Sequence, residues 1–277
     1  MQKRTSIIRV FVVTVLFALI WQIRETYIQR EKKEQLRQEM QSQEPGADTP
    51  ETEQSTENSM EKTQEPPEQI PQEPEVLSQF QELVKQNKDF VGWITLEGTQ
   101  IDYPIMQCED DEYYLHHNFY GEEDRYGELY VRARADMTTP GTNVIIYGHN
   151  MRDGAMFGEI DNFKKEKFFE EHRFISFSTL HEEYTYEIMA VFLSKVYNVE
   201  DEVFKYYNFY EAETEEEFQD FYDNVKALSL YDTGVTAEFG DKFITLSTCA
   251  YHVKDGRMVI VAKQLREEQE PCAQREG

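Results

Sequence analysis

Short apolar runs bounded by turn residues recur along this chain from about residue 76 to residue 265. Their length and their content of β-branched and aromatic residues are typical of β-strands, and many such strands at close spacing predict a mainly β barrel or sandwich. The strands are expected at 91–96, 100–105, 128–131, 143–147, 174–177, 184–193, 242–247 and 257–262.

Three segments are instead expected to be helical, and two of them show the helical period of apolar positions. The clearest begins with a capping box, Thr214 followed by Glu217, which predicts the start of a helix. Its apolar stripe consists of Phe218, Phe221, Tyr222 and Val225. This spacing is that of a buried helix face, so we expect the stripe to pack on the core rather than to bind a ligand. The other two helices are expected at 76–84 and at 155–169.

The N-terminal part of the chain has a different pattern. Residues 7–23 are apolar apart from Arg9, Thr14 and Gln22, and this stretch is near the lower limit of about 17 residues for a membrane-spanning helix. No small-residue cleavage site follows it, so residues 1–30 are predicted to hold an uncleaved signal anchor. Basic residues flank the stretch on both sides, so the positive-inside rule leaves its orientation open.

Residues 31–75 are rich in Gln, Glu and Pro and contain very few large apolar side chains. Such a stretch cannot bury enough surface to offset its chain entropy, so it is predicted to be a disordered, solvated tether, partly helical at about 31–40. The sequence therefore predicts four parts: the anchor region at 1–30, the tether at 31–75, a folded domain at 76–265 and a polar tail at 266–277.

Composition narrows the range of functions. The formal net charge of −26 argues against a nucleic-acid partner, because a phosphate backbone is met by clustered Lys and Arg. The three cysteines, Cys108, Cys249 and Cys272, are too few and too irregularly spaced for a disulfide framework or a zinc site. No metal and no cofactor are therefore expected. A single bridge between Cys108 and Cys249 remains an alternative.

The strongest candidate for chemistry is the run TLSTC at 245–249, a strand-like segment that ends in Cys249. Arg257 follows eight positions later, and His149 stands just after the apolar run at 143–147. A thiol, an imidazole and a guanidinium together make nucleophilic acyl transfer plausible. Taken singly, each residue also has an ordinary interpretation, as a core thiol, a structural histidine or a surface charge.

These segments resemble the signature of the sortases, the membrane-anchored cysteine transpeptidases of Gram-positive bacteria. The chain resembles class B sortases in particular. The matching motifs are FVGWI at 90–94, IDYPIMQ at 101–107, YYL at 113–115, and GHNM at 148–151 with Met156 and Phe157. The resemblance covers about 76–265 and implies an eight-stranded β-barrel with an added N-terminal helix and a long helix before the last two strands. It also implies a single-pass protein of the cell membrane, with its N-terminus inside and its catalytic domain extracellular.

The resemblance assigns roles to individual residues. Cys249 is the expected nucleophile, His149 the general acid and base, and Arg257 the group that stabilises the oxyanion or the substrate carbonyls. Positions that line the sorting-signal groove are matched by Leu115, Tyr147, Ser247 and Thr248. The segment 201–209 is expected to read the first residues of the signal, although ordinary packing explains its aromatic side chains equally well.

One departure from the family pattern concerns the residues after the cysteine. Some class B members have an acidic residue there that has been proposed to assist the histidine. In this chain Ala250, Tyr251 and His252 follow, and Asp255 is the nearest acid. We therefore predict a Cys-His-Arg set rather than a Cys-His-Asp triad.

By resemblance, the Cys249 thiolate attacks the threonine carbonyl of an NPxTN-like or PPxTG-like sorting signal in a surface protein, and an amine of a peptidoglycan precursor resolves the thioacyl-enzyme. A pilin lysine is the alternative acceptor. The order of residues argues against an L,D-transpeptidase, which has a His-Gly-Cys-x-Arg cluster, and against a papain-like enzyme, whose cysteine precedes its histidine. A membrane-tethered protein that merely binds a partner is the non-enzymatic alternative.

Overall fold

The computed structural model describes residues 24, 28, 31–38 and 74–266. Residues 31–38, at the start of the predicted tether, are helical. The predicted span at 7–23, the tether from 39 to 73 and the tail from 267 onward lie outside the described residues. Within the described ranges, no helix is both long enough and apolar enough to cross a membrane.

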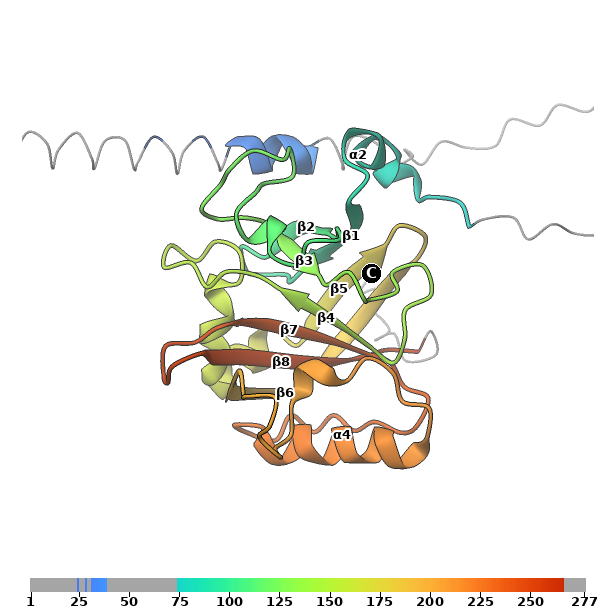
Figure 1. Cartoon of the computed structure of the whole chain (residues 1–277), viewed down its shortest axis with the longest axis vertical. Coiled ribbons are helices and arrows are strands. Elements are labelled where there is room, and N and C mark those ends of the chain that lie inside the picture. The colour runs from blue at the N-terminus through green and yellow to red at the C-terminus, as the bar shows by residue number, and fades with distance from the viewer. Residues whose placement is uncertain (1–23, 25–27, 29–30, 39–73, 267–277) are drawn as a thin grey trace, which may run out of the picture. The chain divides into compact units, whose positions relative to one another are not determined.

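Eight strands close into a barrel, in the order β1-β2-β3-β4-β7-β8-β6-β5 (Figure 1). Their bounds are β1 Phe90–Thr95, β2 Asp102–Met106, β3 Leu129–Val131, β4 Asn143–Tyr147, β5 Phe174–Thr179, β6 Glu183–Lys195, β7 Phe243–Cys249 and β8 Gly256–Gln264. Two neighbouring pairs, β2 with β3 and β4 with β7, are parallel, and the other pairs are antiparallel. The predicted eight-stranded barrel is confirmed, with the strand ends shifted slightly.

Strand β8 is buried on both faces, which explains its unbroken apolar run. Met258 and Ile260 belong to the hydrophobic cluster that fills the barrel, whereas Val259 and Val261 belong to a second cluster beneath helix α4 (Glu215–Leu228). Neighbouring residues of a strand point to opposite faces, so one strand serves both clusters. The odd-numbered residues of β8, including Arg257, consequently face the outside of the barrel.

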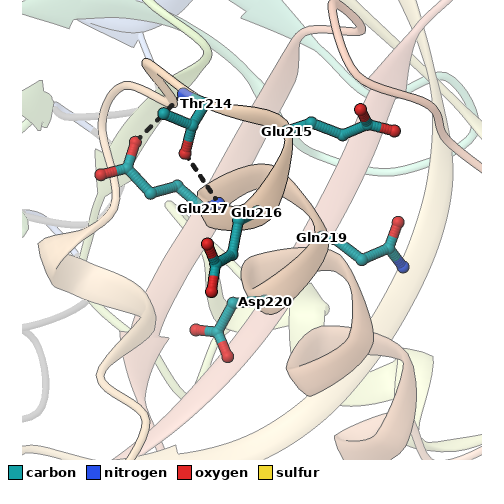
Figure 2. A pocket seen from close by; sticks show the side chains of 6 residues that line it. All are labelled: Thr214, Glu215, Glu216, Glu217, Gln219 and Asp220. Atoms are coloured by element: carbon teal, nitrogen blue, oxygen red, sulfur yellow. Dashed lines mark hydrogen bonds between the residues drawn. The ribbon is translucent and has the colours of Figure 1, made fainter.

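Helix α4 lies along the outside of the barrel (Figure 1) and begins with the predicted capping box. The Thr214 hydroxyl accepts a hydrogen bond from the backbone N–H of Glu217 at 3.2 Å, and the Glu217 carboxylate accepts one from the backbone N–H of Thr214 at 3.3 Å. Figure 2 shows both bonds among the acidic side chains of the first turn. Phe218, Phe221 and Val225 are buried, so the aromatic stripe packs on the core as expected.

The other two predicted helices differ from expectation. The one expected at 76–84 consists of a 3-10 turn, η1 (Ser78–Phe80), followed by the short helix α2 (Gln81–Gln86). The single helix expected at 155–169 is wrong, because this segment forms a 3-10 helix, η3 (Gly158–Lys164), and then α3 (Glu166–Glu171).

Two backbone conformations explain why the second of these helices is divided. Met156 has a φ of 54°, in the left-handed region, and it pairs with Asn150 in an isolated bridge. A helix cannot start across such a residue. Lys165 has extended dihedral angles, with φ −102° and ψ 117°, and separates η3 from α3. A turn that pairs Met156 with the nearby Asn150, and the extended residue Lys165, therefore prevent one continuous helix over this segment.

Candidate active site

Two strands that are far apart in sequence bring His149 next to Cys249. Strands β4 and β7 pair in parallel, and the last pair of their ladder is Tyr147 with Ser247. His149 and Cys249 each lie two residues beyond this pair. Side chains two residues along a strand return to the same face, so imidazole and thiol start from adjacent positions on the same face. Both residues are half-buried.

Arg257 lies on the other side of the thiol. In the antiparallel pairing of β7 with β8, Arg257 is the residue directly opposite Cys249. Such partners share a face of the sheet, with Cβ atoms about 4.5–5.5 Å apart. The Arg257 guanidinium donates from Nη1 to the Gly256 carbonyl at 3.0 Å and is half-buried. The three residues predicted to be catalytic therefore come together at one end of three adjacent strands.

The orientation of the His149 ring is set by a backbone carbonyl. Nε2 of His149 lies 2.8 Å from the carbonyl oxygen of Leu115, the last residue of η2 (Tyr113–Leu115). A carbonyl oxygen can only accept, so Nε2 carries a hydrogen and donates it. In the neutral ring, Nδ1 is then the nitrogen with a free lone pair, available to take up a proton. Leu115, predicted from the family resemblance to line the substrate groove, thus also contacts the histidine through its main chain.

The other three predicted groove residues, Tyr147, Ser247 and Thr248, are all buried, and two of their hydroxyls are bonded within the protein. Ser247 is buried, and its hydroxyl forms a 2.7 Å hydrogen bond with the phenol of Tyr206, which starts η4 (Tyr206–Asn208). Burial raises the pKa of Tyr206 to about 12, so this phenol stays protonated at neutral pH. Tyr147 stacks on Tyr130 with 5.5 Å between ring centroids, and burial also raises its pKa.

Thr248 is buried, with 2% of its surface exposed. Its hydroxyl donates to the carbonyl of Gly148, the residue before His149, at 2.7 Å. The threonine hydroxyl is thus directed at the histidine segment.

Aromatic side chains of the segment 201–209 pack on the protein itself. The Phe209 ring stacks on Phe221 of α4, with 3.9 Å between centroids, and Phe204 contacts the same ring at 5.9 Å. Tyr206 is 1% exposed. Packing under α4 therefore accounts for these three rings, and it fixes the segment next to Ser247.

Cys108 and Cys249 are both free thiols, so the alternative of a bridge between them is not realised. Burial raises the pKa of the Cys108 thiol, and nearby carboxylates, including Asp89, raise it further. A thiol with a raised pKa is a poor nucleophile at neutral pH. Of these two cysteines, Cys249 is the one placed for chemistry.

Asn150 is a site residue that the sequence interpretation did not assign. Its side-chain Nδ2 donates to the backbone carbonyl of Cys249 at 2.8 Å. Asn150 and Tyr251 also line a cavity of about 680 Å³ that borders the segments following His149 and Cys249. In the sequence, Asn150 is the asparagine of the GHNM motif at 148–151. Nothing in that motif indicates which carbonyl its side-chain amide bonds.

Comparison with known proteins decides the family. The model of the sortase domain family matches residues 94–265. The chain belongs to the sortase family. Sortase B of Listeria monocytogenes is 38% identical over 195 residues, which cover 68% of this chain and 75% of the relative. Sortase B of Staphylococcus aureus is 32% identical over 193 residues, covering 69% and 76%.

Solved sortase B structures have the same fold as this sortase. The Bacillus anthracis enzyme in complex with AAEK1 has a TM-score of 0.62 and 37% identity, covering 69% of this chain and 86% of that one. A Staphylococcus aureus sortase B–substrate complex has a TM-score of 0.62 and 32% identity, covering 70% and 87%. The family predicted from the sequence is confirmed, and this sortase is a cysteine transpeptidase of the sortase B type.

Proposed function

We propose that this sortase cleaves the sorting signal of a surface protein at a Thr–x bond, holds the protein as a thioacyl-enzyme on Cys249, and transfers it to an amine of a peptidoglycan precursor. The observation that carries the proposal is the meeting of Cys249, His149 and Arg257 at one end of β4, β7 and β8. A nucleophile, a proton carrier and a fixed cation are the groups that acyl transfer requires.

In the acylation step, the Cys249 thiolate attacks the threonine carbonyl and a tetrahedral oxyanion forms. The C–N bond then breaks. An amide nitrogen leaves poorly as an anion, so the His149 imidazolium gives it a proton and becomes neutral imidazole. Because Nε2 is held by the Leu115 carbonyl, the proton that moves is the one on Nδ1. The products are a thioester on Cys249 and the free amine of the released C-terminal fragment.

In the second step, an acceptor amine attacks the thioester. Nδ1 of His149 takes the proton that the amine nitrogen loses, the C–S bond breaks, and the Cys249 thiolate is released. This restores the starting state with a new amide bond. Arg257 keeps its charge throughout, so its contribution is to stabilise the oxyanion in both steps.

The substrate is proposed to lie over Leu115, Tyr147 and Ser247, which adjoin His149 and Cys249 through the Leu115 carbonyl and the last pair of the ladder between β4 and β7. Tyr147 and Ser247 are buried, so they would form the floor of the site. The signal is NPxTN-like or PPxTG-like, and the acceptor is a peptidoglycan amine, with a pilin lysine as the alternative. We further propose that residues 7–23 anchor the enzyme in the cell membrane and that the tether at 31–75 holds the catalytic domain outside the cell. The apolar run and the polar composition that follows it support this arrangement.

The proposed function is tested by trapping the intermediate. The full chain is incubated with NPxTN-like and PPxTG-like peptides without an acceptor, quenched in acid and analysed by mass spectrometry. We expect a mass increase equal to the peptide fragment up to the threonine, located on Cys249. Adding a glycine-based or a diamino-acid-based amine should remove this mass and yield the transfer product. A chain that binds these peptides and never cleaves them contradicts the proposal and supports the non-enzymatic alternative.

Arg257→Lys tests whether the guanidinium acts through its shape as well as its charge. Lysine retains the positive charge but lacks the planar fork of donors, so it cannot donate both to the Gly256 carbonyl and to an oxyanion in the same geometry. We expect kcat/KM for thioacyl formation to fall about 10²-fold, and Arg257→Ala to cost about 10²- to 10³-fold. Arg173→Lys, which changes an arginine paired with Glu187, is the control and should retain full activity.

A further inference from the structure

The backbone ladder between β4 and β7 stops just before the two residues that must meet. After the pair of Tyr147 and Ser247, one more bond follows, from the N–H of Gly148 to the carbonyl of Ser247 at 3.3 Å. The main chain of His149 is then engaged elsewhere, because its carbonyl accepts from the N–H of Phe157 at 2.9 Å. At the level of His149 and Cys249, side chains therefore have to make the connection between the two segments.

Two side chains, one from each segment, connect the His149 segment to the Cys249 segment. Thr248, which precedes Cys249, donates its hydroxyl to the carbonyl of Gly148, which precedes His149, at 2.7 Å. Asn150, which follows His149, donates Nδ2 to the carbonyl of Cys249 at 2.8 Å. One bond runs from the cysteine segment to the histidine segment and the other runs back. Together these two side-chain bonds connect the two segments beyond the last backbone hydrogen bond between them.

We propose that Asn150 and Thr248 are positioning residues that hold the His149 segment against the Cys249 segment. The proposal rests on the proposed function of this cysteine and histidine. It gives Thr248 a different role from the groove-lining one expected from the family resemblance, since its buried hydroxyl is already bonded to Gly148. Both side chains bond main-chain carbonyls, so each acts through the main chain of the catalytic segments.

The Gly148 carbonyl is a well-fixed acceptor for this purpose. A Cβ at position 148 would lie 2.3 Å from Cδ2 of Leu129 and 3.0 Å from Cδ2 of Phe157, so the backbone here fits closely against the core. The absence of a side chain at Gly148 lets the segment approach the barrel interior, where Thr248 reaches it. Proton transfer between His149 and the substrate depends on this placement, because a misplacement of about 1 Å can cost about 10²-fold in rate.

The test uses the full chain with Asn150→Ala and Thr248→Val, each with a matched control. Asn224→Ala removes a similar bond on α4, where Nδ2 donates to the Asp220 carbonyl at 2.7 Å. Thr233→Val removes a buried hydroxyl that donates to the Met189 carbonyl at 2.7 Å. The rate of thioacyl formation on Cys249 is measured by quenched mass spectrometry over a range of sorting-signal peptide concentrations.

We expect kcat to fall about 10- to 100-fold in Asn150→Ala and in Thr248→Val, with KM within about twofold of wild type. The two control variants should stay within about twofold in both constants. Thr248→Ser keeps the hydroxyl and should restore most of the rate. In the double variant the losses should be less than multiplicative, because both bonds fix the same pair of segments.

Thermal unfolding of every variant separates loss of fold from loss of position. If Thr248→Val fails to fold, Asn150→Ala still tests the positioning role, because Asn150 is only half-buried and its replacement should be tolerated. The proposal is overturned if the site variants lose no more than their controls, if Thr248→Ser loses as much as Thr248→Val, or if the loss lies in KM. A wild-type chain that forms no thioacyl adduct overturns the proposed function and the positioning role together. An active wild type with unaffected variants overturns the positioning role alone.

Discussion

Cys249→Ala is expected to abolish thioacyl formation and transpeptidation, with a loss of at least about 10⁴-fold in kcat/KM. Alanine has no atom that can form the covalent intermediate, and the remaining groups at the site can only polarise the peptide carbonyl. Cys249→Ser should be nearly as inactive, because a hydroxyl near neutral pH is much less ionised than a thiol. The measurement is quenched mass spectrometry combined with chromatography of the transfer product.

Cys108→Ala is the matched control for this variant. Cys108 is a free thiol in the same chain, but burial and nearby carboxylates raise its pKa, so it should neither carry the adduct nor affect the rate. Cys249 is half-buried at the end of a strand, and its replacement by alanine should leave the midpoint of thermal unfolding almost unchanged. Product formation by Cys249→Ala, or an adduct located on Cys108, contradicts the assignment.

His149→Ala has the second largest expected effect, a loss of about 10³- to 10⁴-fold in kcat/KM. Without the imidazole, no group in the proposed mechanism protonates the leaving amine, and none takes the proton of the acceptor amine. Added imidazole should restore part of the rate, because a small molecule can enter the space left by the ring and carry the proton. Steady-state kinetics with and without imidazole measures both effects.

His172→Ala is a close control for the histidine. Nδ1 of His172 lies 2.8 Å from the carbonyl of Phe168, the same distance that separates Nε2 of His149 from the Leu115 carbonyl, but on a different part of the barrel. Removing His172 should leave kcat/KM within about twofold. Equal losses in the two variants would mean that the rate depends on general stability and not on the imidazole of His149.

The pattern of apolar residues was enough to predict most of the barrel. Strands such as β8 are buried on both faces and read as unbroken apolar runs, and the box of Thr214 and Glu217 defines the start of α4 with local residues alone. The segment 155–169 was predicted wrongly as one helix. There Met156 has a left-handed backbone and pairs with Asn150, and the composition of the segment carries no information about such a pairing.

By itself, the sequence was enough to predict the family, the number of strands and the candidate reactive groups, because strand length, periodicity and the TLSTC and GHNM motifs are all local features. The tertiary structure alone decided how the groups meet. The parallel pairing of β4 with β7 places His149 beside Cys249, and the bonds of Thr248 and Asn150 join segments 100 and 99 residues apart. Hydrogen bonds between residues so far apart in sequence do not follow from any local sequence pattern. The placement of His149 beside Cys249 can therefore be described only from the folded barrel.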